Sequence, residues 1–239
     1  DRIESRGLGD VYKRQKKVTV FFVFFASVFF ILGLWQIERG QAKSKIISQF
    51  NSNLKEEPSY LSDKSLKWDR VFVDGSWHGD EQILVDNIIN NGIAGYKVLT
   101  PLKISDSQQY ILVDRGWIAQ KEFRQDLPDI DIDNGFVRVR GILEDPELGF
   151  VLSDDLVTDK WPKVSQTKNI EIITKEYNKN LMPFILVAEP ILRDSLEHIR
   201  IVPSTMMPVK HYGYSAQWFT MWLAICLMYI WIGFKKNEE

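Results

Sequence analysis

Two long apolar stretches lie near the ends of the chain, and a mostly polar middle separates them. Neither residues 18–35 nor residues 212–234 contain a charged side chain. A helix over the first stretch covers about 27 Å, which is close to the hydrocarbon thickness of a bilayer. We therefore predict two transmembrane helices, over residues 18–37 and 211–234, with short tails at residues 1–17 and 235–239.

The first stretch has a competing interpretation as a cleaved signal peptide, because Lys13, Arg14, Lys16 and Lys17 form a basic region before it. Its apolar run is longer than that of a typical signal peptide, and no small-residue cleavage site follows it, so a retained helix is favoured. For the second stretch the competing interpretation is a buried core helix. Its length, and the Trp and Tyr near both ends, favour a membrane span. Residues 1–15 read like a translated adaptor and are set aside from the fold.

The charges that flank the spans predict their orientation. Lys16 and Lys17 precede the first span, and Lys235 and Lys236 follow the second. Positive flanks prefer the cytoplasmic side, which places both termini inside and residues 38–210 outside. The bias is modest, since Arg39, Lys43, Lys45 and Lys210 lie on the other side. The reverse topology is the alternative.

The segment between the spans has the pattern of a β-rich domain. Residues 38–50 favour a helix that continues the first span outward. Short strands are predicted at residues 68–73, 82–86, 96–100, 109–114, 136–141 and 184–188, with Pro101 ending the third. Residues 152–180 predict a loop around Trp161-Pro162 and one helix at 169–177. The predicted fold class is membrane α+β: two antiparallel transmembrane helices flanking one mainly antiparallel β extracytoplasmic domain, as a sheet or barrel.

Composition narrows the function classes. The 239 residues carry 30 Lys and Arg against 32 Asp and Glu, for a net charge of −2. This balance excludes a strongly basic nucleic-acid binder. A single cysteine, Cys226, excludes an internal disulfide framework and a multi-cysteine zinc site.

Enzyme motifs do not stand out, and we predict no catalytic site. His78, Asp74 and Ser76 can be written as a hydrolase triad, but a surface turn explains the same residues. Asp129, Asp131 and Asp133 alternate as in a calcium loop, but the glycine and terminal glutamate of such a loop are absent.

The most informative residues lie where the first span ends and the second begins. In an antiparallel pair these places are neighbours. Gly33, Gln36 and Gly40 share one helical face, on which small residues permit close approach and Gln36 offers an amide. The second helix carries a face of helically spaced aromatic and polar side chains: His211, Tyr214, Ser215, Trp218 and Trp222.

An imidazole near the hydrocarbon boundary suits a haem iron, since neutral histidine is a common axial ligand. Arg39 and Lys210 would then meet the propionates of the haem. The alternative is structural: interfacial Trp and Tyr commonly anchor a helix, and Arg and Lys snorkel.

Three motifs, in this order and spacing, resemble the surfeit locus protein 1 family, the Shy-type assembly factors of cytochrome c oxidase. The resemblance covers residues 18–234. It departs at Ala42, where the family often has an aromatic residue, and over residues 148–179. The matching residues are Leu32-Gly33-Leu34-Trp35-Gln36 with Arg39 and Lys43; Gly95, Thr100-Pro101-Leu102 and Leu112-Val113-Asp114-Arg115-Gly116-Trp117-Ile118; and His211, Tyr214 and Gln217-Trp218-Phe219.

The resemblance implies a non-enzymatic assembly factor for haem-copper oxidase that binds haem a at the outer membrane interface and assists its insertion into subunit I. It implies His211 as the axial ligand of the haem iron, with Trp35, Gln36, Arg39, Tyr214 and Trp218 around the cofactor. The implied partners are oxidase subunit I, haem a synthase and membrane lipid. The implied location is the bacterial inner membrane with a periplasmic domain, or the mitochondrial inner membrane in a eukaryote.

The residues leave other function classes open. One is a scaffold that stabilises a subunit I intermediate without binding haem. Another is a two-span extracytoplasmic sensor, which the short predicted cytoplasmic tails disfavour. A third is a membrane-anchored hydrolase, which the lack of a convincing triad disfavours.

Overall fold

A computed structural model describes residues 2–123, 125–145, 160–165, 177 and 179–235, with side chains described from residue 16 to residue 234 within these ranges. The chain forms two compact units. Asp1–Gln49 and Val202–Glu239 make the first, and Phe50–Ile201 makes the second.

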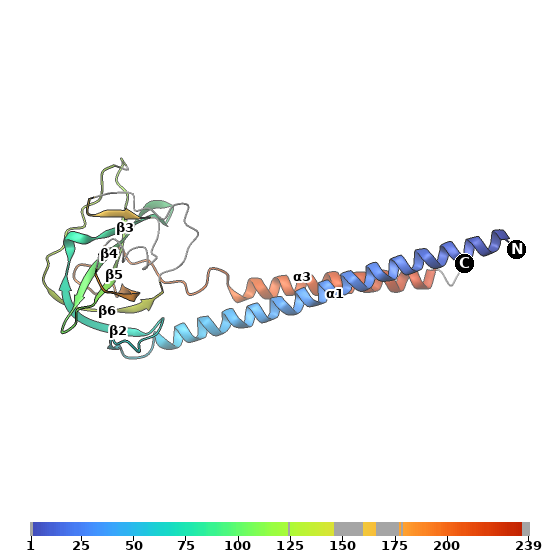
Figure 1. Cartoon of the computed structure of the whole chain (residues 1–239), viewed down its shortest axis with the longest axis horizontal. Coiled ribbons are helices and arrows are strands. Elements are labelled where there is room, and N and C mark those ends of the chain that lie inside the picture. Colours follow the sequence, from blue (N-terminus) through green and yellow to red (C-terminus); the bar gives the residue numbers. More distant parts are fainter. Residues whose placement is uncertain (1, 124, 146–159, 166–176, 178, 236–239) are drawn as a thin grey trace. The chain divides into compact units, whose positions relative to one another are not determined.

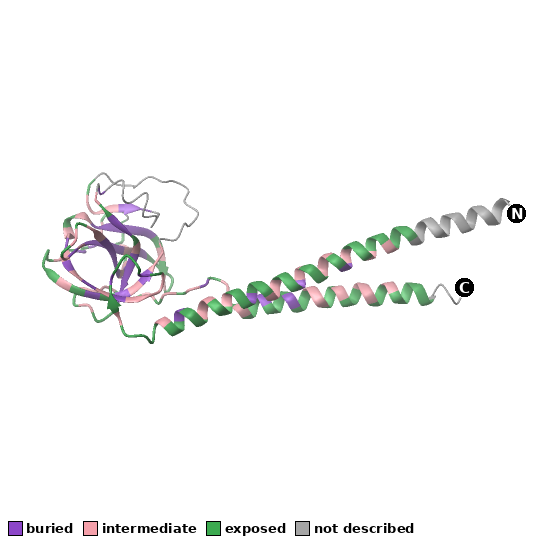
Figure 2. Cartoon of the chain, turned by 60° about the horizontal axis from the view of Figure 1, so that its bottom comes forward, coloured by how far each residue is buried: buried purple, intermediate pink, exposed green. Residues whose placement is uncertain are grey.

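Two long helices form the first unit. Helix α1 (Arg2–Asn53) contains the first apolar stretch, and helix α3 (Pro208–Lys235) contains the second. Both are long and apolar enough to cross a membrane, and most of their side chains from residue 16 onward are exposed in the protein alone (Figure 2). Such apolar exposure suits a surface that faces lipid. The predicted helical continuation of the first span over residues 38–50 is confirmed, because α1 runs on to Asn53.

The second unit is built on one curved sheet (Figure 1). Its elements are β1 (Ser59–Tyr60), β2 (Arg70–Trp77), the 3₁₀ turn η1 (Gly79–Glu81), β3 (Ile83–Asn90), β4 (Ile93–Ile104), β5 (Tyr110–Ala119), β6 (Phe136–Glu144), β7 (Lys163–Ser165) and β8 (Leu181–Ala188). Each predicted strand corresponds to one of these, although the observed strands are mostly longer. The predicted helix at residues 169–177 lies almost wholly outside the described residues.

The sheet closes into a small barrel. Strand β2 pairs with β6, β6 with β8, β8 with β5, β5 with β4, and β4 again with β2. Of these pairings only β5–β8 is parallel. Strand β3 pairs with the first half of β4, and the short β7 extends that edge in parallel. The prediction of a mainly antiparallel domain is therefore confirmed.

The predicted end of the third strand at Pro101 is wrong, since β4 continues through this residue to Ile104. The pairing with β3 ends at Leu99 and the pairing with β2 begins at Leu102. Pro101 thus lies where β4 changes partner on that edge, so its missing N–H removes no bond from either ladder.

Alternation along the strands builds the barrel core. In β2 every second side chain is buried, and Val71, Val73 and Trp77 point inward. They meet Leu102, Ile111, Val113, Val139, Leu143 and Leu186 from the other barrel strands. This period of two is what a strand with one buried face requires.

A buried cation joins two loops to the sheet. Arg115 is only 4% exposed, and its Nη1 donates to Gln82 Oε1 at 2.8 Å and to the Ile130 carbonyl at 3.0 Å. Its Nε donates to the Asp194 carbonyl at 3.1 Å. Thr100 Oγ1 completes the network with a 2.6 Å bond to Gln82 Oε1. Two parts of the central sequence motif, around Thr100 and around Arg115, therefore meet in a polar network inside the domain.

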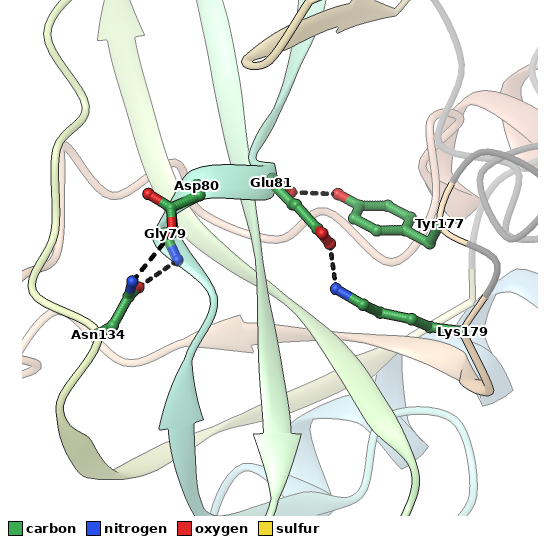
Figure 3. A network of polar contacts seen from close by, with 6 residues as sticks. All are labelled: Gly79, Asp80, Glu81, Asn134, Tyr177 and Lys179. Carbon is green, nitrogen blue, oxygen red and sulfur yellow. Dashed lines mark hydrogen bonds and ion pairs between the residues drawn. The ribbon is translucent and has the colours of Figure 1, made fainter.

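A second set of polar side-chain contacts holds the turn η1 in place (Figure 3). The side chain of Asn134 accepts from the Gly79 amide at 2.7 Å and donates to the Asp80 carboxylate at 3.1 Å. On the other side Tyr177 donates its hydroxyl to the Glu81 carbonyl at 2.6 Å, and Lys179 pairs with the Glu81 carboxylate. These contacts tie segments distant in sequence to the connection between β2 and β3.

Candidate functional site

The two helices of the first unit pack closely because small residues of α1 face aromatic rings of α3. A Cβ atom added at Gly33 would lie 2.8 Å from the Phe219 ring, and one at Gly40 would lie 2.6 Å from the Tyr212 ring. Ala26, Gly33 and Gly40 are all buried. Their seven-residue spacing places these three residues along one line of α1 that packs against α3. This line of contact between the two helices is the seam.

Two hydrogen bonds cross this seam. His211 Nδ1 lies 2.8 Å from Gln36 Oε1, and Ser215 Oγ donates to the Gly33 carbonyl at 2.9 Å. Both His211 and Ser215 are more than nine-tenths buried. The predicted meeting of the end of the first span with the start of the second is therefore present in the structure.

The bond to Gln36 decides the chemistry of the imidazole. An amide oxygen only accepts, so Nδ1 is the donor of this bond, and in the neutral tautomer with that N–H the lone pair lies on Nε2. Among the described residues Nε2 has no hydrogen-bond partner and almost no exposed surface. A histidine that is held through Nδ1 and has no hydrogen-bond partner at Nε2 has the donor arrangement of an axial ligand to iron.

The donor chemistry thus fits a haem iron, whereas the free space does not, because Nε2 exposes less than 1 Å². With the side chains as they lie, iron has no path to this nitrogen.

The other predicted site residues divide into two groups. Gln36 and Trp218 belong to the helix pair: Gln36 bonds His211, and the Trp218 ring packs 5.8 Å from that of Phe29. Trp35 and Tyr214 are 44% and 45% exposed, and Arg39 lies over the Trp35 ring at 5.4 Å. The structure therefore places His211 inside the seam and an indole, a phenol and a guanidinium on the outer surface of the same helix pair.

Contacts deeper in the pair were not anticipated from the sequence. The Phe22 and Tyr229 rings stack at 4.2 Å, and the Tyr229 hydroxyl lies 3.0 Å from Thr19 Oγ1. Trp222 packs at 5.5 Å against Phe30. The signal was available, because residues 211, 215, 218, 222, 225 and 229 alternate steps of four and three, the spacing of a continuous packing seam.

The hydrolase triad does not form in the barrel. Both oxygens of Asp74 accept from Arg138 at 2.7 Å, and this bond lowers the pKa of Asp74. The His78 ring instead packs edge-on against Tyr110 at 5.1 Å. Burial, followed by nearby Lys179, lowers the pKa of His78. Asp129 accepts the amide of Asp131, as expected of a loop turn.

Fold and site together define a membrane protein with two spans, an extramembrane β-barrel and a buried imidazole between its helices. Residues 23–223 match the SURF1 family. The chain belongs to this family, as the sequence motifs predicted.

Curated relatives carry related names. A SURF1-like protein of Monosiga brevicollis is 27% identical over 176 residues, which are 67% of this chain and 66% of that protein. The cytochrome oxidase assembly protein SHY1 of Saccharomyces cerevisiae is 31% identical over 41% of this chain and 27% of its own length. A SURF1-like protein of Rickettsia bellii is 22% identical over 93% of this chain and 92% of its own. This chain thus spans less than two thirds of the length of the Monosiga and Saccharomyces relatives.

Proposed function

We propose that this protein is an assembly factor for haem-copper oxidase that holds haem a as cargo at the outer membrane interface and assists its insertion into oxidase subunit I. The observation that carries the proposal is the His211 imidazole between the helices, which is held through Nδ1 and has no hydrogen-bond partner at Nε2 among the described residues. The family and the printed name of the yeast relative support the assembly role.

In this proposal the protein breaks and makes no covalent bond of a substrate. His211 supplies one reversible axial ligand, which suits a cargo that has to leave again. Gln36 holds the ring in the tautomer that leaves Nε2 free to bind. Trp35, Arg39 and Tyr214, exposed on the same helix pair, provide aromatic and cationic surface for the ring and propionates of the haem.

The proposal places the two spans in a bacterial inner membrane, with both termini cytoplasmic and the barrel in the periplasm. The charges beside the spans support this orientation. Oxidase subunit I and haem a synthase are the proposed partners of the outer domain.

Cells that make haem a provide the test. Wild-type protein purified from them in detergent should carry haem absorption, and His211→Ala should lose it. His198→Ala, which removes an exposed histidine of the barrel unit, is the matched control and should keep the haem. Wild-type protein without any haem would refute the carrier role.

One observation favours a second candidate, a scaffold that stabilises a subunit I intermediate without haem. Nε2 of His211 is covered by protein, as a residue that only ties two helices together would be. A scaffold predicts that His211→Ala still supports oxidase assembly in cells. A carrier predicts that the same variant leaves subunit I without haem a.

A further inference from the structure

A groove lies on the barrel unit between the C-terminal end of α1 and the end of β8. Its volume is about 270 Å³. Its walls are apolar and come from Phe50 and Leu54 of the helix end, Ile142 of β6 and Val187 of β8. This space fits one or two apolar side chains and is smaller than a typical cofactor pocket.

The rim of the groove has an excess of positive charge. Arg70 is neutralised, because it pairs with Glu189 at 2.7 Å and also donates to the Glu56 carbonyl. Arg200 and His198 line the same groove and are exposed. Among the described residues neither side chain has a hydrogen bond or an ion pair. The Arg200 guanidinium and the N–H of the His198 imidazole therefore remain available to an anionic partner.

The segment that carries these two residues has no regular structure beyond one bridge to the barrel. Glu197 pairs with Trp117 of β5, and residues 198–201 continue without regular structure. Within the described part of the chain, the backbone of residues 198–201 makes no hydrogen bond. The side chains of His198, Arg200 and Ile201 all line the groove. Backbone groups without partners beside a groove are a template for an added strand.

We propose that this groove binds an extended segment of a partner protein in which acidic and apolar residues alternate. The segment pairs with the backbone of residues 198–201 by β-strand addition. Its apolar side chains enter the space between Phe50, Leu54, Ile142 and Val187, and its carboxylates meet Arg200 and His198.

The observations favour a peptide over a lipid headgroup. A lipid offers no backbone groups to pair with residues 198–201. The inference extends the assembly role proposed above and rests on it only for the identity of the partner.

The experiment uses the full chain in nanodiscs of zwitterionic lipid, with empty nanodiscs as the blank. The probe is a short fluorescent peptide that alternates glutamate with leucine, and binding is followed by fluorescence anisotropy. Arg200→Glu replaces an attraction by a repulsion and should weaken binding roughly tenfold. Arg193→Glu makes the same change at an exposed arginine that does not line the groove, and should leave binding unchanged. A peptide methylated on alternate backbone nitrogens should not bind.

Absence of peptide binding to the wild-type protein, or equal binding to Arg200→Glu, would overturn the proposal. Equal binding of the methylated peptide would overturn strand addition. Arg200-dependent binding of vesicles of anionic lipid, without peptide binding, would assign the groove to lipid instead. The haem absorption of Arg200→Glu, measured on the same preparation, reports separately on the proposed carrier function and should equal that of the wild type.

Discussion

Gln36 and His211 are 175 positions apart in the sequence, and their side chains meet at 2.8 Å between the two membrane helices. This bond links the motif at the end of the first span to the motif at the start of the second. It also fixes which imidazole nitrogen remains free, so the helix pairing and the proposed chemistry depend on the same contact.

Removing the acceptor at Gln36 tests that dependence. Gln36→Leu leaves the imidazole without a fixed tautomer and should weaken haem affinity tenfold or more, the usual effect of losing a partner behind a metal ligand. The measurement is a spectrophotometric haem titration of the purified full chain. Gln217→Leu makes the same change at an exposed position of α3 and should have no effect. Unchanged affinity in Gln36→Leu would show that this bond does not prepare the ligand.

Close packing of the helices predicts a second effect. Gly33→Leu places a side chain where the Phe219 ring already lies within 2.8 Å of the added Cβ, so it should destabilise the helix pair by about 1–3 kcal/mol. Gly213→Leu is the control, because nothing lies within 4 Å of a Cβ at that position. Thermal unfolding of the full chain in detergent should separate the two variants, and equal melting temperatures would contradict the packing described here.

Arg115 should be important for the stability of the barrel unit. Arg115→Met removes the donor to the Asp194 carbonyl and one of two donors each to Gln82 Oε1 and the Ile130 carbonyl, and losses of this kind cost about 1–3 kcal/mol. The variant should melt at a clearly lower temperature when unfolding of the full chain is followed by circular dichroism in the β region. Arg193→Met, at an exposed arginine, should melt like the wild type.

The pKa of His78 predicts a pH dependence of stability. Burial disfavours the charged ring, so the pKa of His78 in the folded state lies below its ordinary value of 6.5. Between the two pKa values the unfolded chain binds more protons, and stability therefore falls as pH drops below 6.5 and levels off below the folded pKa. His78→Gln should flatten this part of the curve of unfolding free energy against pH. His198→Gln, on an exposed imidazole, should leave the slope as it is in the wild type.

Much of this structure follows from local patterns. Apolar runs of bilayer length identified both helices, and the antiparallel connection implied that Gly33 and Gln36 would lie near His211. Alternation of apolar and polar residues located the strands.

The change of strand partner along β4 was not predicted from the sequence, because strand pairing depends on residues far apart in the chain. Pro101 was read as a strand end, although the switch from β3 to β2 removes the need for its N–H. Arg115 was recognised as part of a motif, but its partners Gln82, Ile130 and Asp194 come from three separate segments.

The seam between the helices was also predicted only in part. Gly33 and Gly40 were read as small residues for close approach, and both contact α3. The ring that covers Gly40 belongs to Tyr212, whereas Tyr214, which helical spacing groups with His211 and Ser215, is 45% exposed. The period of a helix does not fix its rotation to within one residue, and here packing against the glycine seam determines it.

The most direct test of the carrier account is the absorption spectrum of the purified full chain, made in cells that synthesise haem a, with His211→Ala beside it. The account predicts a haem a spectrum for the wild type, its loss in His211→Ala, and its retention in His198→Ala. A wild-type spectrum without haem, or a haem spectrum that survives in His211→Ala unchanged, would contradict the assignment of His211 as the ligand.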